Sequence, residues 1–153
     1  MTTILIAADE SEESVNAARV AHLLFGDDAE YLVINVGSSI PNDVMAWGYA
    51  YPVAMPMLAY PPQLAERAPG EPTPVEEAED RASAIAAAAA IEGAEAVGDV
   101  GDPSEAILVA ARDQGADVIV VGSHERSWFS RLLTGSVSHD VVRRSEIPVL
   151  VVK

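Results

Sequence analysis

The stretch VVGSHERSWFSRLLTGSVSHD, residues 120–140, decides the fold of this chain. An apolar run ends in it at Gly122, and a second glycine, Gly135, is followed by serines and the start of a helical apolar periodicity. Glycine lets the backbone approach a ligand closely, and the unpaired amides at a helix start attract anions. A phosphate site typically has this order of strand, glycine-containing turn and helix start. However, Glu125 inside the turn would repel a phosphate. The stretch therefore predicts a strand–turn–helix unit with a ligand site at the turn, and it leaves the charge of that ligand open.

The alternation of strands and helices extends over the rest of the chain. Continuous apolar runs predict buried strands, and capping residues predict where helices start. The expected strands are residues 3–8, 30–36, 94–100, 117–123 and 147–153. The expected helices run from Ser11 to Gly26, from Thr73 to Gly93, from Asp102 to Gly115 and from Ser136 to Arg144. In the second of these helices, Glu76 is expected to close a capping box with Thr73. This order predicts an α/β fold, a parallel sheet with helices on both faces, in which a ligand lies at the carboxyl ends of the strands where the strand order reverses. The pattern alone does not determine the strand order.

Composition restricts the class of protein. The chain has 153 residues, the size of one domain, and no cysteine, which excludes disulfides and thiolate metal sites. Its 24 acidic and 9 basic residues give a net charge of −15, which disfavours nucleic acid as a partner. No apolar run reaches the ~18 residues of a membrane span, and the amino-terminal segment lacks the basic flank of a signal peptide. We expect one domain, residues 1–153, that is soluble and cytoplasmic, with an acidity that reflects either a high-salt host or codon bias.

An irregular segment interrupts this pattern at residues 37–72, which hold seven of the ten prolines. Within it, VMAWGYAYPVAMPMLAY, residues 44–60, combines methionines and aromatic residues with two prolines. A lid over the site, an oligomer contact and a loop packed against its own domain all fit this composition. The segment is expected to be an insert between the second strand and the second helix.

Three stretches, ILIAADESEES (4–14), DVGDPSEAILVAARDQGADVIVVGS (99–123) and VGSHERSWFSRLLTGSVSHDVVRRSEIPVLVV (121–152), together resemble the universal stress protein family. The family signature is Gly, two residues, Gly, nine residues, Gly and then Ser or Thr. Here the spacing is kept from Gly122 to Gly135 and Ser136, but Glu125 stands where the second glycine belongs. The family's first loop reads Asp-Gly-Ser, and here Glu10 replaces that glycine too.

The resemblance implies a five-stranded parallel sheet of order 3-2-1-4-5, Rossmann-like and of the adenine nucleotide alpha hydrolase kind. With that order, the turns that leave strands 1 and 4 face each other across one cleft. The resemblance also implies a homodimer formed through the last strand. An apolar edge strand needs a partner, and this supports the dimer independently. The strand residues expected at the dimer contact are Val149, Leu150, Val151 and Val152.

The resemblance further implies an adenine nucleotide, ATP with Mg²⁺ or AMP, as the ligand. The candidate ligand-binding residues are Ala8, Asp9 and Val36 near the base and ribose, Gly122, Gly135, Ser136 and Val137 at the phosphates, and Ser123, His124 and Glu125 in the loop between them. Two unit charges ~5 Å apart at an effective dielectric constant of ~20 repel by ~3 kcal/mol, so Glu125 opposes this ligand unless a cation offsets it or its side chain points to solvent. A less anionic ligand, or none, therefore remains open.

The function predicted from these residues is regulatory: binding of a small ligand, with no catalytic residues and no protein metal site. No nucleophile–base pair and no metal-like histidine spacing occur in the chain. Asp9 is expected to be a turn residue or an adenine contact rather than a general base or metal ligand. The alternative is a dimeric interaction module of the stress response that has lost nucleotide binding, and a third reading is a slow ATPase.

Overall fold

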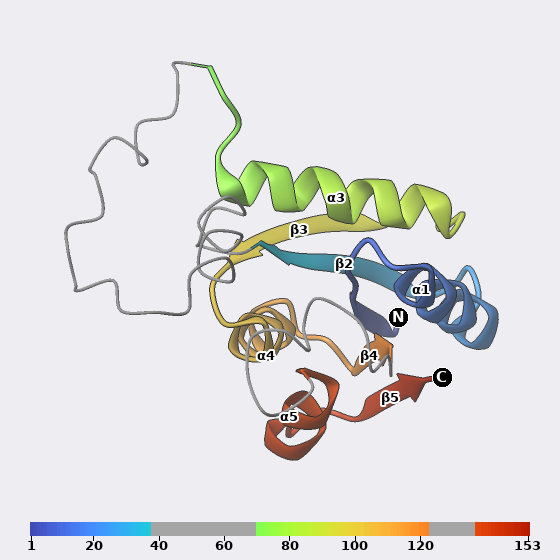
Figure 1. Cartoon of the computed structure of the whole chain (residues 1–153). Helices are drawn as coiled ribbons and strands as arrows, with labels where there is room; N and C mark the ends of the chain where they lie inside the picture. The colour runs from blue at the N-terminus through green and yellow to red at the C-terminus, as the bar shows by residue number, and fades with distance from the viewer. Residues whose placement is uncertain (38–69, 123–136) are drawn as a thin grey trace.

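A computed structural model describes residues 1–37, 70–122 and 137–153 of the chain, and its strands form one five-stranded sheet (Figure 1). The elements in chain order are β1 (Thr3–Ala7), α1 (Glu12–Phe25), β2 (Glu30–Gly37), α3 (Pro74–Ala88), β3 (Glu95–Val100), α4 (Pro103–Asp113), β4 (Val118–Gly122), α5 (Val137–Arg144) and β5 (Val149–Val152). The expected order of strands and helices along the chain is therefore confirmed. The insert expected at residues 37–72 lies almost wholly outside the described residues.

The sheet has the order β3-β2-β1-β4-β5, and every neighbouring pair is parallel. Ile4 of β1 is paired with Tyr31 on one side and with Val118 of β4 on the other. Successive strands run outward from β1 to β3 and then return to the other side of β1, so the strand order reverses between β1 and β4. This confirms the order that the resemblance implied, and it identifies the carboxyl ends of β1 and β4 as the switch point.

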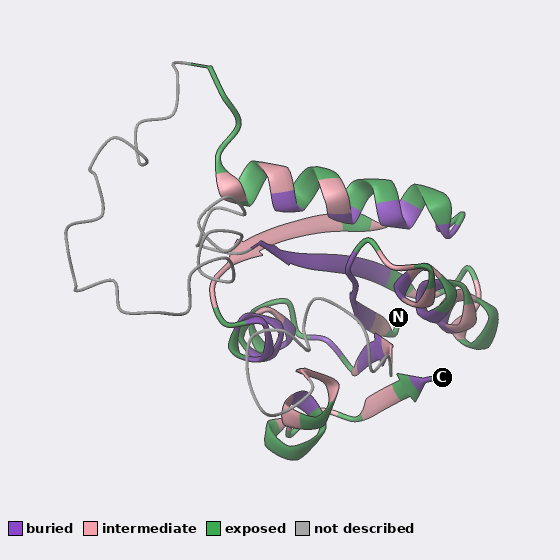
Figure 2. Cartoon of the chain, viewed as in Figure 1, coloured by how far each residue is buried: buried purple, intermediate pink, exposed green. Residues whose placement is uncertain are grey.

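Helices cover both faces of the sheet because the apolar side chains of each strand alternate between two cores. Ile4 and Ile6 pack with α1 and α3, whereas Leu5 packs with α4 and with Val141 of α5. Figure 2 shows the consequence: β2 is buried along almost its whole length, and β3 at the edge is only half-buried. Continuous apolar runs in the central strands thus reflect burial on two faces.

Three of the four expected helix starts are confirmed by their caps, and the fourth, Ser136, lies outside the described residues. The Ser11 side chain accepts a hydrogen bond from the Ser14 amide, and Thr73 and Glu76 form a reciprocal capping box at the start of α3. Asp102 caps α4 by accepting from the amide of Glu105. These side chains satisfy amides that a helix start otherwise leaves unpaired.

The expected end of α3 at Gly93 is wrong, because the helix ends at Ala88. The amides of Ala90 and Ile91 donate back to the carbonyls of Ala87 and Ala86, which closes a Schellman motif with Ala90 in the left-handed region at φ 57°. Ile91 then packs into the core beneath α3. The burial of Ile91 turns the chain before the glycine that local sequence signals favour.

Candidate functional site

The candidate site lies at the carboxyl edge of the sheet, where β1 and β4 end side by side. Ala7 is paired with Val121, so the turns that begin at Ala8 and Gly122 leave the sheet next to each other. A Cβ placed on Gly122 would lie 3.7 Å from the carbonyl oxygen of Glu13 in the first turn of α1. The end of β4 therefore lies against the helix start that follows β1.

Asp9 is the anchor of the first turn. It is 1% exposed, and its Oδ1 accepts hydrogen bonds from the Ser11 amide at 3.1 Å, from Ser14 Oγ at 2.6 Å and from the Ser11 hydroxyl. The amide of Asp9 in turn donates to Ser14 Oγ at 3.0 Å. A carboxylate at a helix start is also stabilised by the helix dipole. Asp9 thus builds a rigid turn, which is the turn-residue role expected for it.

Glu10, which replaces the glycine of the family's first loop, points away from this network. Its Oε1 lies 3.7 Å from Arg81 Nε of α3, and its side chain is 75% exposed. Arg81 also lies 3.5 Å from the carboxylate of Glu77. The negative charge that the sequence places in the turn is therefore partly offset by a cation from a distant part of the chain, which Glu10 shares with Glu77.

Asn35 is a polar member of the edge that was not predicted from the sequence. It is 2% exposed, and its Nδ2 donates to the carbonyl oxygen of Ala8 at 2.9 Å. Its Oδ1 is buried and has no hydrogen-bond partner within residues 1–37, 70–122 and 137–153. The signal in the sequence was a single amide inside the otherwise apolar run EYLVINV, residues 30–36.

Three other predicted site residues lie at this edge with their side chains directed into the protein. Val36 is 1% exposed and belongs to the core beneath α4, against which Val137 at the start of α5 also packs. Ala8 belongs to the opposite core, and both its amide and its carbonyl are hydrogen-bonded, to Ile34 O and Asn35 Nδ2. Any contact that Val36 makes with a ligand must therefore come from its backbone, whereas Val137 is only partly buried.

The remaining predicted loop residues lie outside the described residues. They are Ser123, His124, Glu125, Gly135 and Ser136. Within residues 1–37, 70–122 and 137–153, no group of three or more histidine or carboxylate side chains could hold a metal ion. The described part of the chain also contains no helix long and apolar enough to cross a membrane.

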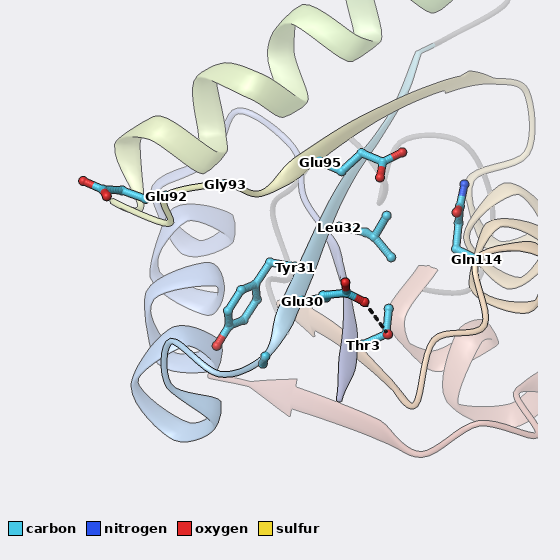
Figure 3. Close-up of a pocket in the computed structure, with 9 residues that line it drawn as sticks. Thr3, Glu30, Tyr31, Leu32, Glu92, Gly93, Glu95 and Gln114 are labelled. Atoms are coloured by element: carbon cyan, nitrogen blue, oxygen red, sulfur yellow. Dashed lines mark hydrogen bonds between the residues drawn. The ribbon is translucent and has the colours of Figure 1, made fainter. Parts of the chain in front are cut away.

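A hollow lies at the opposite edge, where β1, β2 and β3 begin (Figure 3). It has a volume of about 250 Å³, and Thr3, Glu30, Glu92, Glu95 and Gln114 are among its lining residues. The Thr3 hydroxyl donates to the Glu30 carboxylate at 3.4 Å, as Figure 3 shows. This hollow is distant in the fold from the switch point and was not predicted from the sequence.

Comparisons of this chain with protein families, with curated proteins and with solved structures all point to the same family. A model of the universal stress protein family matches residues 1–153. Universal stress protein MJ0577 of Methanocaldococcus jannaschii is 46% identical over 54 residues, which are 35% of this chain and 33% of that protein. The aligned stretch thus spans about one third of the length of this curated relative.

Solved structures share the fold over almost the whole chain. The structure of MJ0577 matches with a TM-score of 0.61 at 26% identity, covering 99% of this chain and 94% of that one. A universal stress protein solved in complex with cAMP matches with a TM-score of 0.60 at 24% identity, covering 99% and 95%. A family protein of Arabidopsis thaliana with AMP bound matches with a TM-score of 0.54 at 20% identity, covering 99% and 91%.

Proposed function

Because this chain belongs to the universal stress protein family, we propose that it is a regulatory protein that binds an adenine nucleotide between the turns after β1 and β4. The observation that carries the proposal is the buried Asp9 network, which holds a rigid turn directly beside the end of β4. This is the place where doubly wound sheets bind ligands. The cAMP and AMP complexes of structural neighbours support an adenine nucleotide as the ligand class.

In the proposed complex, the base and ribose lie near the backbone of Ala8, Asp9 and Val36. The phosphates approach the start of α5, where amides not yet used by the helix attract negative charge. The residues proposed at the phosphates are Gly122, Ser123, His124, Gly135, Ser136 and Val137. Glu125 is proposed to weaken the binding of highly charged nucleotides, so that AMP binds with less penalty than ATP.

The charge arrangement of the first turn supports an anionic ligand. Glu10 is mostly exposed and lies near Arg81, which it shares with Glu77, so its charge is partly offset where the ligand is proposed to bind. Exposed pairs are screened by solvent and contribute little to stability, but they do lower the local negative potential. The chain has a net charge of −15, so a lower negative potential at the first turn favours the binding of an anionic nucleotide.

We propose binding rather than turnover. Oδ1 of Asp9 already accepts from two serine side chains and one amide, which commits this oxygen to the turn rather than to a metal ion or a proton transfer. If Mg²⁺ accompanies ATP, the phosphates are its natural ligands, with protein carboxylates adding one or two contacts at most.

The active form is proposed to be a homodimer through β5. This strand is at the edge of the sheet, and Val151 is 40% exposed while Val149 and Leu150 are half-buried. An apolar edge strand is a template for pairing with a second chain, and an isologous pair of such edges closes a twofold dimer.

Thermal unfolding in the presence of AMP, ATP and ATP with Mg²⁺ tests the nucleotide proposal. Ligand at 100 times its dissociation constant adds about 2.7 kcal/mol to the free energy of unfolding, which raises Tm by several degrees. GMP serves as the control nucleotide. Absence of a shift with every adenine nucleotide at millimolar concentration would remove the proposal.

An interaction module without nucleotide is the second candidate, and one feature favours it. Leu23 and Leu24 at the end of α1 are 84% and 60% exposed, and α1 contacts β5. Exposed neighbouring leucines on a helix are typical of a protein contact. This candidate would be supported if no nucleotide changes the Tm of the protein and if the substitution Leu23→Asn dissociates the dimer. A dimer that is unaffected by Leu23→Asn would oppose it.

A further inference from the structure

Asn35 is a buried amide at the carboxyl edge whose hydrogen bonding is only half satisfied. Its Nδ2 donates to Ala8 O at 2.9 Å, while its Oδ1 has no partner although the residue is 2% exposed. The other buried side-chain atom without a partner in the described part of the chain is His22 Nδ1, which lies near the turn into β2 at the opposite end of α1. A buried acceptor without a partner destabilises a fold, so stability alone does not account for an asparagine at this position.

The backbone around Asn35 leaves it little freedom. Its partner on β3 is Gly98, where an added Cβ would lie 2.2 Å from the carbonyl oxygen of Val75 in α3. Helix α3 therefore approaches the sheet directly beside Asn35. Because the amide is planar, its unpaired oxygen lies within about 5 Å of the Ala8 carbonyl oxygen to which the nitrogen donates. The half-satisfied amide is thus placed at the turn that leads into Asp9.

We propose that Asn35 is a positioning residue for the ligand site: it holds the Ala8 carbonyl and so sets the position of the turn against which the nucleotide binds. This inference rests on the proposed function. Ala8 is fixed to β2 twice, by its amide to Ile34 O at 3.0 Å and by its carbonyl to Asn35. The following residue, Asp9, is fixed from the other side by Ser14. Loss of the Asn35 amide releases one of these restraints without removing the core.

The substitution Asn35→Leu separates positioning from stability. Leucine keeps the branching of asparagine but is larger; it removes the unpaired oxygen, leaves the Ala8 carbonyl without its donor and packs more tightly, so a moderate loss of stability is expected. We expect Tm of the ligand-free protein to fall by a few degrees and the Kd for AMP, measured by isothermal titration calorimetry, to rise about tenfold. Asn35→Ala is the second variant, with the same expected loss of affinity and a lower Tm.

Two controls make the result specific. Ile107→Val shortens a buried side chain in the core beneath α4, on the other face of the sheet, and is expected to lower Tm by a few degrees with Kd unchanged. Asn16→Ala removes an exposed amide of α1 and is expected to change neither. The backbone amide resonance of Asp9, followed by NMR without ligand, is expected to shift in Asn35→Leu and to stay in place in both controls.

The outcomes distinguish the inference from the function on which it rests. If wild-type protein binds no AMP, the proposed function fails, and the NMR comparison still tests whether Asn35 sets the turn. If wild-type protein binds AMP and Asn35→Leu binds it equally well, the positioning role is wrong and the nucleotide proposal stands. If Ile107→Val lowers Tm by the same amount as Asn35→Leu and also loses the same affinity for AMP, Asn35 acts only through stability. That result would also overturn the inference.

Discussion

Glu10 Oε1 lies 3.7 Å from Arg81 Nε, so the carboxylate of the turn after β1 is paired with helix α3. The two residues are far apart in the sequence and meet only because α1 and α3 cover the same face of the sheet. The pair brings a cation, which Arg81 shares with Glu77, beside one of the two carboxylates that the sequence places near the proposed ligand.

Arg81→Gln is expected to weaken AMP binding two- to fivefold at low ionic strength, because Glu10 then presents an unmatched charge near the cleft. The loss should shrink in about 0.5 M salt, where the Debye length falls below the separation of the charges. Titration calorimetry at two salt concentrations measures both effects. Arg112→Gln, the same charge change at an exposed position in the last turn of α4, is the control, and an equal loss there would mean that net charge alone is responsible.

Glu125→Gly is expected to strengthen ATP binding at least tenfold, since a carboxylate ~5 Å from a phosphate at an effective dielectric constant of ~20 repels by ~3 kcal/mol. Glu10→Gly is the matched variant and should change affinity less than threefold, because Glu10 is already paired and exposed. Fluorescence or calorimetric titration with ATP checks the difference. Unchanged affinity in Glu125→Gly would show that this carboxylate points to solvent.

Ala90→Gly is expected to stabilise the protein by about 0.5–1 kcal/mol, because residue 90 takes a left-handed φ of 57° that glycine adopts without strain. The homologous position after α4 already has a glycine, Gly115, at φ 64°. Urea denaturation measures the change in the free energy of unfolding. Ala84→Gly, in the exposed middle of α3, should instead destabilise by about 1 kcal/mol.

Asp102→Ala is expected to destabilise by about 1 kcal/mol at neutral pH, through loss of the cap of α4. Hydrogen bonds from the Ser104 hydroxyl and the Glu105 amide, with the charge of Arg144, hold the pKa of Asp102 below its usual value. A carboxyl with a lowered folded-state pKa contributes stability above its unfolded pKa of about 3.9 and loses that contribution as pH falls through the folded value.

The difference between wild-type protein and Asp102→Ala should therefore shrink in acid. Denaturation at neutral pH and at about pH 3 measures it, and a difference independent of pH would contradict the cap assignment. Asp113→Ala is the control, because a carboxylate at the carboxyl end of α4 opposes the helix dipole and its removal should not destabilise.

The edge of the sheet that forms the candidate site was predictable because it depends on local patterns. Apolar runs ending at Ala8 and Gly122 marked the strands, and Ser11 marked the helix start. What local patterns missed depends on packing. Helix α3 was expected to continue to Gly93, but burial of Ile91 ends it at Ala88. In the sequence, Asn35 is only a polar exception in an apolar strand. The structure shows that its side-chain amide donates a hydrogen bond to the Ala8 carbonyl oxygen.

The class of fold, the family, the helix caps and the two turns proposed as a ligand site could be predicted from the sequence alone, because strand burial, capping and turn chemistry each act over a few residues. Only the tertiary structure decided the pairing of Glu10 with Arg81, the half-satisfied amide of Asn35 beside Ala8, and the close approach of α3 over Gly98. Those relations join residues that lie far apart along the chain. They arise from how helices and strands pack, which no local pattern specifies.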